Sequence, residues 1–157
     1  MQIADLLSPE GVLSSLKVKE KKLLLQQLAD KSSHLAQVDE RRIFETLVER
    51  ERLGTTGVGQ GIAIPHGRLA EVKKIVGIFA KLETPLEYEA VDNQPVDLVF
   101  MLLAPEGAGA DHLKALARVS RLLRNQAACE KLRKATSAEE LYAILTEPPA
   151  GASSVAA

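Results

Sequence analysis

The residue of this sequence best suited to chemistry is His66, which stands between Pro65 and Gly67. The proline stiffens the backbone on one side of the histidine, and the glycine leaves the other side unobstructed. Such a segment can present an imidazole at a surface that the phosphohistidine of another protein approaches. Imidazole has an ordinary pKa of about 6.5, so much of it is a neutral nucleophile at neutral pH without special activation. The tripeptide alone favours an ordinary loop histidine over a reactive one, because short motifs match often by chance.

Glycines crowd residues 54–67, but they do not form either of the two common nucleotide-binding motifs. The alternating Gly57, Gly59 and Gly61 precede a short extended run and a proline, whereas a dinucleotide fingerprint follows a strand and opens a helix. The segment also has no Gly-Lys-Ser or Gly-Lys-Thr, which a P-loop requires. We therefore predict a shaped loop here, with one short strand at most, around residues 62–64.

Apolar patterning predicts the elements that position this loop. Residues 19–30 have the spacing of an amphipathic helix, and a second helix should run from an N-cap at Asp39 to Leu53. Residues 75–82 and 96–103 are apolar at nearly every position. Uninterrupted apolar runs of this length are typical of central strands that are covered on both faces.

The second half of the chain is predicted to be mostly helical. A helix capped by Asp111 should bury one apolar face, made of Leu113, Leu116, Ala117, Val119, Leu122 and Leu123. A last helix should run through Leu145 from a capping box, formed either by Thr136 with Glu139 or by Ser137 with Glu140. We expect one α/β or α+β domain over residues 1–147, a sheet flanked by helices, and a disordered tail over residues 148–157.

Composition narrows the class of protein. Among 157 residues, 20 Lys and Arg balance 21 Asp and Glu to a net charge of −1, so nucleic acid is not an expected partner. No segment approaches the roughly 18 apolar residues of a membrane span, so direct membrane insertion is not expected either. The single Cys129 cannot form an internal disulfide, which favours the cytoplasm, and we interpret it as a small core residue.

Four motifs extend the signal beyond the Pro-His-Gly tripeptide. They are Arg50-Glu51, Gly54-Thr55-Thr56-Gly57-Val58-Gly59, Gly61-Ile62-Ala63-Ile64-Pro65-His66-Gly67, and His112-Leu113 with Ala117. In order and spacing, over about residues 5–146, the chain resembles the fructose/mannitol-type enzyme IIA proteins of the bacterial phosphotransferase system, including the nitrogen-regulatory member. The resemblance implies that family's fold, a single domain with a mixed β-sheet flanked by helices on both faces.

The resemblance also implies a site. In that family the histidine of the Pro-His-Gly motif is phosphorylated by the histidine phosphocarrier protein, and that position is His66 here. The matching positions His112 and Arg50 are expected to stabilise the phosphoryl group by hydrogen bonds. Backbone and side-chain donors of the glycine-rich segment are expected to complete a phosphate cradle: Thr55, Thr56, Gly57, Gly59 and Gly61. No metal and no cofactor is expected.

Several functions stay open at this point. A phosphotransferase that regulates partners in nitrogen, potassium or carbon metabolism is favoured, because neither an enzyme IIB domain nor a membrane domain accompanies the motifs. A sugar-specific enzyme IIA that passes phosphate to an enzyme IIB is the first alternative, and a non-catalytic docking module is the second. A metal-dependent enzyme is least favoured, because His66 and His112 are 46 positions apart and belong to no metal-ligand motif. Without the resemblance, Arg50 would be interpreted as a solvated charge and His112 as an ordinary helix residue.

Overall fold

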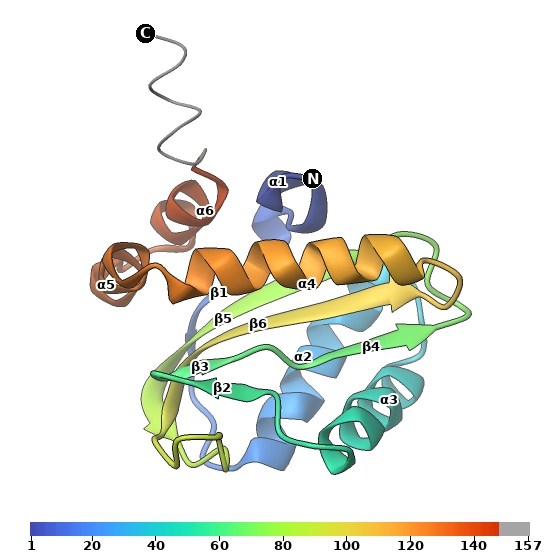
Figure 1. Ribbon diagram of the computed structural model, residues 1–157, viewed down its shortest axis with the longest axis horizontal. Helices are drawn as coiled ribbons and strands as arrows, with labels where there is room; N and C mark the ends of the chain where they lie inside the picture. Colours follow the sequence, from blue (N-terminus) through green and yellow to red (C-terminus); the bar gives the residue numbers. More distant parts are fainter. Residues whose placement is uncertain (148–157) are drawn as a thin grey trace, which may run out of the picture.

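A six-stranded mixed β-sheet organises the molecule (Figure 1). The computed structural model describes residues 1–147, and the predicted tail at 148–157 lies outside the described residues. Five strands follow the order β1-β5-β6-β3-β2, and β4 pairs with β6 as well. The strands are β1 (Val12–Leu16), β2 (Gly57–Gly59), β3 (Ile62–Ala63), β4 (His66–Leu69), β5 (Val76–Leu86) and β6 (Val96–Pro105).

The two long strands lie in the middle of the sheet, as predicted. β5 and β6 pair antiparallel with Phe79 opposite Phe100. Successive side chains of a strand point to opposite faces, and both faces are buried here. Ile78 and Ala80 belong to one hydrophobic core, whereas Phe79 and Phe100 belong to the other. This double burial is the physical reason why both strands are apolar at nearly every position.

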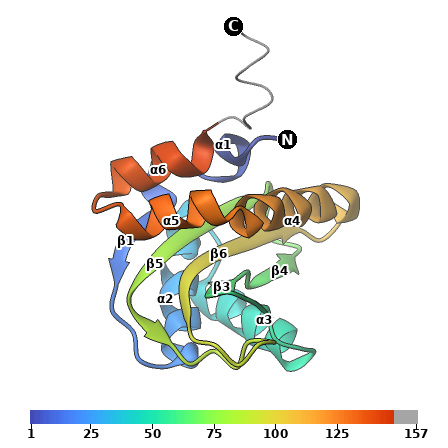
Figure 2. The same ribbon diagram turned by 60° about the vertical axis from the view of Figure 1, so that its left-hand side comes forward.

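Helices cover the two faces of the sheet, which confirms the predicted fold class (Figure 2). One face packs against α2 (Lys21–Ala36) and α3 (Glu40–Arg52). The other packs against α1 (Ile3–Leu6), α4 (Gly109–Arg124), α5 (Gln126–Lys134) and α6 (Ala138–Thr146), with a short 3-10 turn at Pro9–Gly11. No helix within residues 1–147 is both long enough and apolar enough to cross a membrane.

Helix α3 matches its prediction closely, whereas α2 is longer than predicted. The Asp39 side chain accepts a hydrogen bond from the backbone N–H of Arg42 and so caps α3. Helix α2 continues beyond residue 30, where Ser32 is buried and its hydroxyl donates to the Leu28 carbonyl. It ends at Gln37, whose backbone is left-handed with φ 55°.

The prediction of at most one short strand in the glycine-rich segment was wrong, since β2, β3 and β4 all lie there. β2 turns back onto β3, and both β3 and β4 run parallel to β6. Ile62 lies opposite Leu98 and His66 opposite Leu102, so β4 continues the register of β3 across Pro65. Proline is tolerated there because this is an edge of the sheet, where a missing N–H breaks no ladder bond.

The predicted N-cap of α4 was also wrong. The helix begins at Gly109 after Ala108, which places Asp111 in its first turn. The buried stripe consists of His112, Ala115, Val119 and Leu123. This stripe leaves Leu113 on the outer side of the helix with 69% of its surface exposed, contrary to prediction. The capping alternative with Ser137 is the one that α6 uses, since the Ser137 hydroxyl accepts from the N–H of Glu140. Cys129 is buried in the core, as predicted.

Candidate functional site

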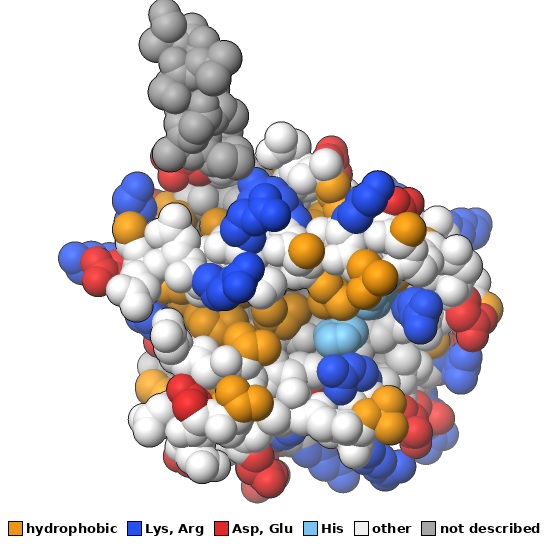
Figure 3. All heavy atoms as spheres, viewed as in Figure 1, with side chains coloured by type: hydrophobic (Ala, Val, Ile, Leu, Met, Phe, Trp, Pro, Cys, Tyr) orange, Lys and Arg blue, Asp and Glu red, His pale blue; other side chains and the backbone are white. Residues whose placement is uncertain are grey.

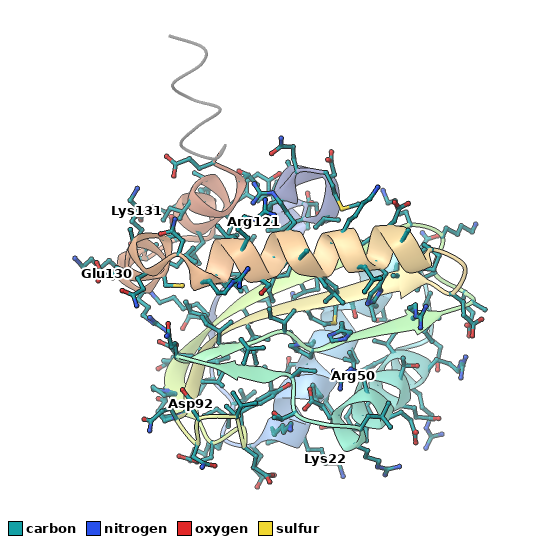
Figure 4. All side chains as sticks on the ribbon, viewed as in Figure 1. Lys22, Arg50, Asp92, Arg121, Glu130 and Lys131 are labelled. Carbon is teal, nitrogen blue, oxygen red and sulfur yellow. The ribbon has the colours of Figure 1, made fainter. Side chains whose placement is uncertain are left out.

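His66 stands where three elements meet. It is the first residue of β4, at the edge of the sheet. The last turn of α3 supplies Arg50, and the first turns of α4 supply His112. Figure 4 shows Arg50 between the end of α3 and this edge. The structure therefore brings together, from distant parts of the sequence, the three residues singled out for phosphate chemistry.

Two hydrogen bonds define the state of the His66 ring. Nδ1 lies 2.8 Å from the backbone oxygen of Ile64, and a carbonyl oxygen only accepts, so Nδ1 carries the proton. The Nε–H of Arg50 lies 3.2 Å from Nε2, and a guanidinium only donates, so Nε2 is unprotonated. Both contacts favour the same neutral tautomer. Nε2 thus holds the lone pair of the ring and is its nucleophilic atom.

The electrostatic surroundings of His66 keep the ring neutral. Partial burial is the largest cause that lowers its pKa from the ordinary value, and the positive charge of Arg50 lowers it further. The Ile64 carbonyl and the Glu51 carboxylate act in the opposite direction and raise it, without reversing the shift. The neutral, nucleophilic form therefore dominates at neutral pH.

His112 faces His66 across the site. The two ring centroids are 5.5 Å apart and the rings are tilted by 59°. His112 is only 7% exposed, and burial is the main reason why its pKa is lowered, with smaller contributions from His66 and Arg68. It lies one turn into α4, where the helix dipole favours an anion and disfavours another cation. A neutral His112 at this position is able to donate one hydrogen bond to an anion beside His66.

The residues predicted to form a phosphate cradle have hydrogen-bond partners within the fold. The Thr55 hydroxyl accepts from the backbone N–H of Gly57. Thr56 is buried, and its hydroxyl contacts Glu51 and Tyr88. Gly59 and Gly61 have φ of 106° and 83°, in the left-handed region that suits the turn between β2 and β3. These contacts explain the residue types by the fold alone, and the cradle stays a prediction.

Gly57 offers a direct test of this structural explanation. A Cβ at this position would lie 2.7 Å from the Ala90 Cβ and 2.9 Å from the Tyr88 ring. We expect Gly57→Ala to lower the free energy of unfolding by about 1–3 kcal/mol through overpacking, measured by urea denaturation. Gly107→Ala is the control, because a Cβ there meets nothing within 4 Å. Equal stability of the two variants would contradict the close packing.

Sequence reasoning missed three residues close to the site: Glu51, Tyr88 and Lys21. Glu51 was noticed only as the neighbour of Arg50 in a motif, although its side chain is 7% exposed and lies 2.8 Å from Lys21 Nζ. Tyr88 is fully buried, and its hydroxyl donates to Glu51. Burial and the charge of Glu51 both raise the pKa of Tyr88, so its hydroxyl keeps its proton. No sequence pattern pairs these residues, which come from different elements.

The surface around the site is apolar with basic side chains at its border. Figure 3 shows histidine at the surface beside hydrophobic side chains, with Lys or Arg close by. Leu53, Val58 and Leu113 are 85%, 51% and 69% exposed, and they lie on or next to the elements that border the site. Val58 also lines a groove between the β2–β3 hairpin and α4, together with Gly59, Gln60, Ile62, Ile64, Ser120, Leu123, Arg124 and Gln126. Within residues 1–147, no three His, Cys, Asp or Glu side chains are grouped as metal ligands.

Comparisons with known proteins agree on the family and the fold. Residues 5–147 match the family model described as phosphoenolpyruvate-dependent sugar phosphotransferase system, EIIA 2. The chain is 57% identical over 152 residues to a nitrogen regulatory protein of Bradyrhizobium diazoefficiens, covering 97% of this chain and 99% of that one.

Two solved structures are similar to this one. The nitrogen regulatory protein IIA-Ntr from Neisseria meningitidis superimposes with a TM-score of 0.88 at 38% identity, covering 92% of this chain and 99% of that one. Enzyme IIAMTL from Escherichia coli, in complex with phosphorylated enzyme IIBMTL, matches with a TM-score of 0.76 at 19% identity. That match covers 91% of this chain and 100% of the other, and it shows a shared fold.

Proposed function

Because the chain belongs to the EIIA 2 family of the phosphoenolpyruvate-dependent sugar phosphotransferase system, we propose that it carries a phosphoryl group on His66 and regulates partner proteins through its phosphorylation state. The observation that supports this proposal most strongly is the hydrogen bonding of the His66 ring. Its Nδ1 is bound to the Ile64 oxygen, and its lone pair at Nε2 lies beside the Arg50 guanidinium.

The chemistry assigned to His66 is a direct displacement. Nε2 attacks the phosphorus of a phosphohistidine on the donor protein, and the bond between phosphorus and the donor nitrogen breaks as the new bond forms. The positive charge that develops on the His66 ring is stabilised at Nδ1–H by the Ile64 oxygen, 2.8 Å away. No proton has to leave the ring during the attack. The ring is therefore oriented for this step before the donor arrives.

The surrounding groups stabilise the phosphoryl group in transit. Its equatorial oxygens carry dispersed negative charge, so positioned donors supply most of the catalysis. The Arg50 Nε–H lies 3.2 Å from Nε2, so a small movement takes it from the nitrogen to a phosphoryl oxygen. His112 and the first turn of α4 lie on the other side and favour the same anion.

We assign the donor as a histidine phosphocarrier protein acting in the cytoplasm. The exposed Leu53, Val58 and Leu113 provide apolar contact area for a protein that must bring its own phosphohistidine to His66. A phosphoryl group adds about −1.5 to −2 charges at this surface, which is enough to favour one partner and repel another. Phosphorylation thereby becomes a switch of partner choice.

Regulation is favoured over sugar uptake by near full-length similarity to a nitrogen regulatory protein. The alternative is transfer of the phosphoryl group to an enzyme IIB, and the shared fold of an enzyme IIA bound to phosphorylated IIB supports it. A docking module without phosphoryl chemistry is the remaining alternative. These functions differ in whether an adduct forms and in whether a second protein removes it.

Intact-mass spectrometry tests the proposal. The protein is incubated with phosphoenolpyruvate, enzyme I and histidine phosphocarrier protein, of either the nitrogen or the sugar type. We expect a single phosphate-sized mass gain that is lost in acid and kept in alkali. Absence of any gain with both donor types would leave the docking module as the better account. Loss of the adduct on addition of an enzyme IIB would favour the sugar-uptake alternative.

A further inference from the structure

Behind the site, Glu51 is a buried carboxylate with several donors. Oε2 accepts from Lys21 Nζ at 2.8 Å and from the Thr56 backbone N–H at 3.2 Å. Oε1 accepts from the Tyr88 hydroxyl at 2.9 Å and from the Thr56 hydroxyl. The Lys21 ammonium also lies 4.3 Å from the centre of the Tyr88 ring. A carboxylate this buried is stable only because each oxygen has such partners.

One path of hydrogen bonds leads from Glu51 to the His66 ring. Glu51 holds both the N–H and the hydroxyl of Thr56. The Thr56 carbonyl accepts from the Ile64 N–H at 2.9 Å. The Ile64 carbonyl then accepts from Nδ1 of His66 at 2.8 Å. Three links therefore join Glu51 to the His66 ring, and the last of them is the contact that fixes its tautomer.

A second path leads from Glu51 to Arg50. The Arg50 Nη1–H donates to the Gly54 carbonyl at 2.8 Å, and its Nε–H points to Nε2 of His66. The Gly54 N–H donates to the Glu51 backbone carbonyl at 3.2 Å, which ties one end of this segment to α3. The other end, two residues on, is tied by the Glu51 side chain at the Thr56 N–H. Gly54 has φ 152°, and a Cβ added there would meet nothing within 4 Å, so no side-chain packing fixes this residue. Glu51 thus restrains both partners of the Arg50–His66 contact.

We infer that Glu51 is a positioning residue of the phosphoryl-transfer site, acting through Thr56 on the tautomer of His66 and on the direction of Arg50. The inference rests on the proposed function for its kinetic consequence. Its structural consequence, the state of the His66 ring, is measurable without any phosphoryl transfer. Lys21 and Tyr88 support the carboxylate and have no contact of their own with His66 or Arg50 among the hydrogen bonds and ion pairs of the described residues.

A purely structural role predicts a different result. The Lys21–Glu51 ion pair joins α2 to α3 and on its own would affect only stability. Lys21→Met removes this ion pair but leaves both contacts of Glu51 with Thr56. Glu51→Gln removes the ion pair as well, and it leaves one acceptor oxygen where four donors converge. Lys21→Met therefore reports the effect of losing the ion pair alone, whereas Glu51→Gln also reports the effect of losing the anchor of Thr56.

The experiment compares Glu51→Gln and Lys21→Met with Glu49→Gln in the full chain. Glu49 lies on the same helix, is 71% exposed and forms a surface ion pair with Arg52. Two quantities are measured on folded protein: the ¹⁵N shifts of the His66 ring before phosphorylation, and the initial rate of phosphorylation. Movements on the order of 1 Å at a reacting group cost up to about 100-fold, so we expect Glu51→Gln to be about tenfold to 100-fold slower.

We expect Glu51→Gln also to shift the His66 ring signals towards a mixture of tautomers. Lys21→Met should lose stability yet keep its ring signals and rate close to those of Glu49→Gln. Unchanged ring signals and rate in Glu51→Gln would overturn the inference, and so would equal slowing in Lys21→Met. If the wild type itself takes no phosphate, the proposed function fails, whereas the ring signals of the unphosphorylated variants still test Glu51.

Discussion

His66→Ala is expected to take no phosphoryl group at all. The imidazole is the attacking group in the proposed step, and its Nε2 is the atom whose lone pair is free of a proton. His66 is half-buried at a sheet edge, so its replacement by alanine leaves the core intact. Intact-mass spectrometry after incubation with phosphoenolpyruvate and the general phosphotransferase proteins measures the outcome.

The other two histidines are matched controls, because the chain contains only three. His34→Ala should be phosphorylated like the wild type, since His34 lies in the last turn of α2 with its side chain 77% exposed. His112→Ala should still form the adduct, but more slowly, because it loses one donor and keeps the nucleophile. If His66→Ala still formed the phosphoryl adduct and His112→Ala formed none, the roles of the two histidines would be reversed.

Arg50→Ala is expected to slow phosphorylation by about 100-fold to 1000-fold, as removal of one preorganised donor does in other sites. The Arg50 Nε–H lies beside Nε2 and is the charged donor nearest to the incoming phosphoryl group. Arg50→Lys should recover only part of the rate, because an ammonium lacks the planar fork that reaches Gly54 and the site together. Initial phosphorylation rates of the two variants and the wild type are compared by phosphate-affinity gel electrophoresis or mass spectrometry.

The pH of this measurement matters. The charge of Arg50 lowers the pKa of His66, so its removal raises that pKa and leaves less neutral imidazole at weakly acidic pH. At about pH 8, well above the ordinary histidine pKa of about 6.5, the ring is neutral in both proteins. Any slowing of phosphorylation that Arg50→Ala still shows at this pH reports the loss of a group that stabilises the phosphoryl group. Arg52→Ala, which loses only an exposed ion pair with Glu49, is the control and should match the wild type.

The residues that the structure brings together at the candidate site were predictable from sequence because they stand in local motifs. Pro65 and Gly67 mark His66 as a special position, and the Asp39 cap and the apolar stripe predicted the helix that carries Arg50. The continuous apolar runs correctly predicted β5 and β6 as central strands, since burial on both faces leaves no room for polar alternation. Local pattern and tertiary structure agree in these elements.

The remaining features depend on contacts that a local pattern does not contain. β3 lies where one short strand was predicted, but β2 and β4 are only three and four residues long and form because β3 and β6 offer pairing partners, so glycine content misrepresented them as loop. The apolar spacing of α4 allowed two neighbouring stripes, and packing onto β6 chose the one with His112 inside and Leu113 outside. The buried contact of Glu51 with Tyr88 joins residues 37 positions apart, which no motif predicted.

The central claim is that Nε2 of His66 accepts the phosphoryl group while Nδ1 keeps its proton. Long-range ¹H–¹⁵N correlation of the histidine rings, recorded before and after phosphorylation, tests it in one measurement. We predict an unprotonated Nε2 in the free protein and, in the phosphorylated protein, a phosphorus-coupled Nε2 with a protonated Nδ1 on the same ring. Phosphorus on Nδ1, on His112 or on no ring would contradict the proposed mechanism.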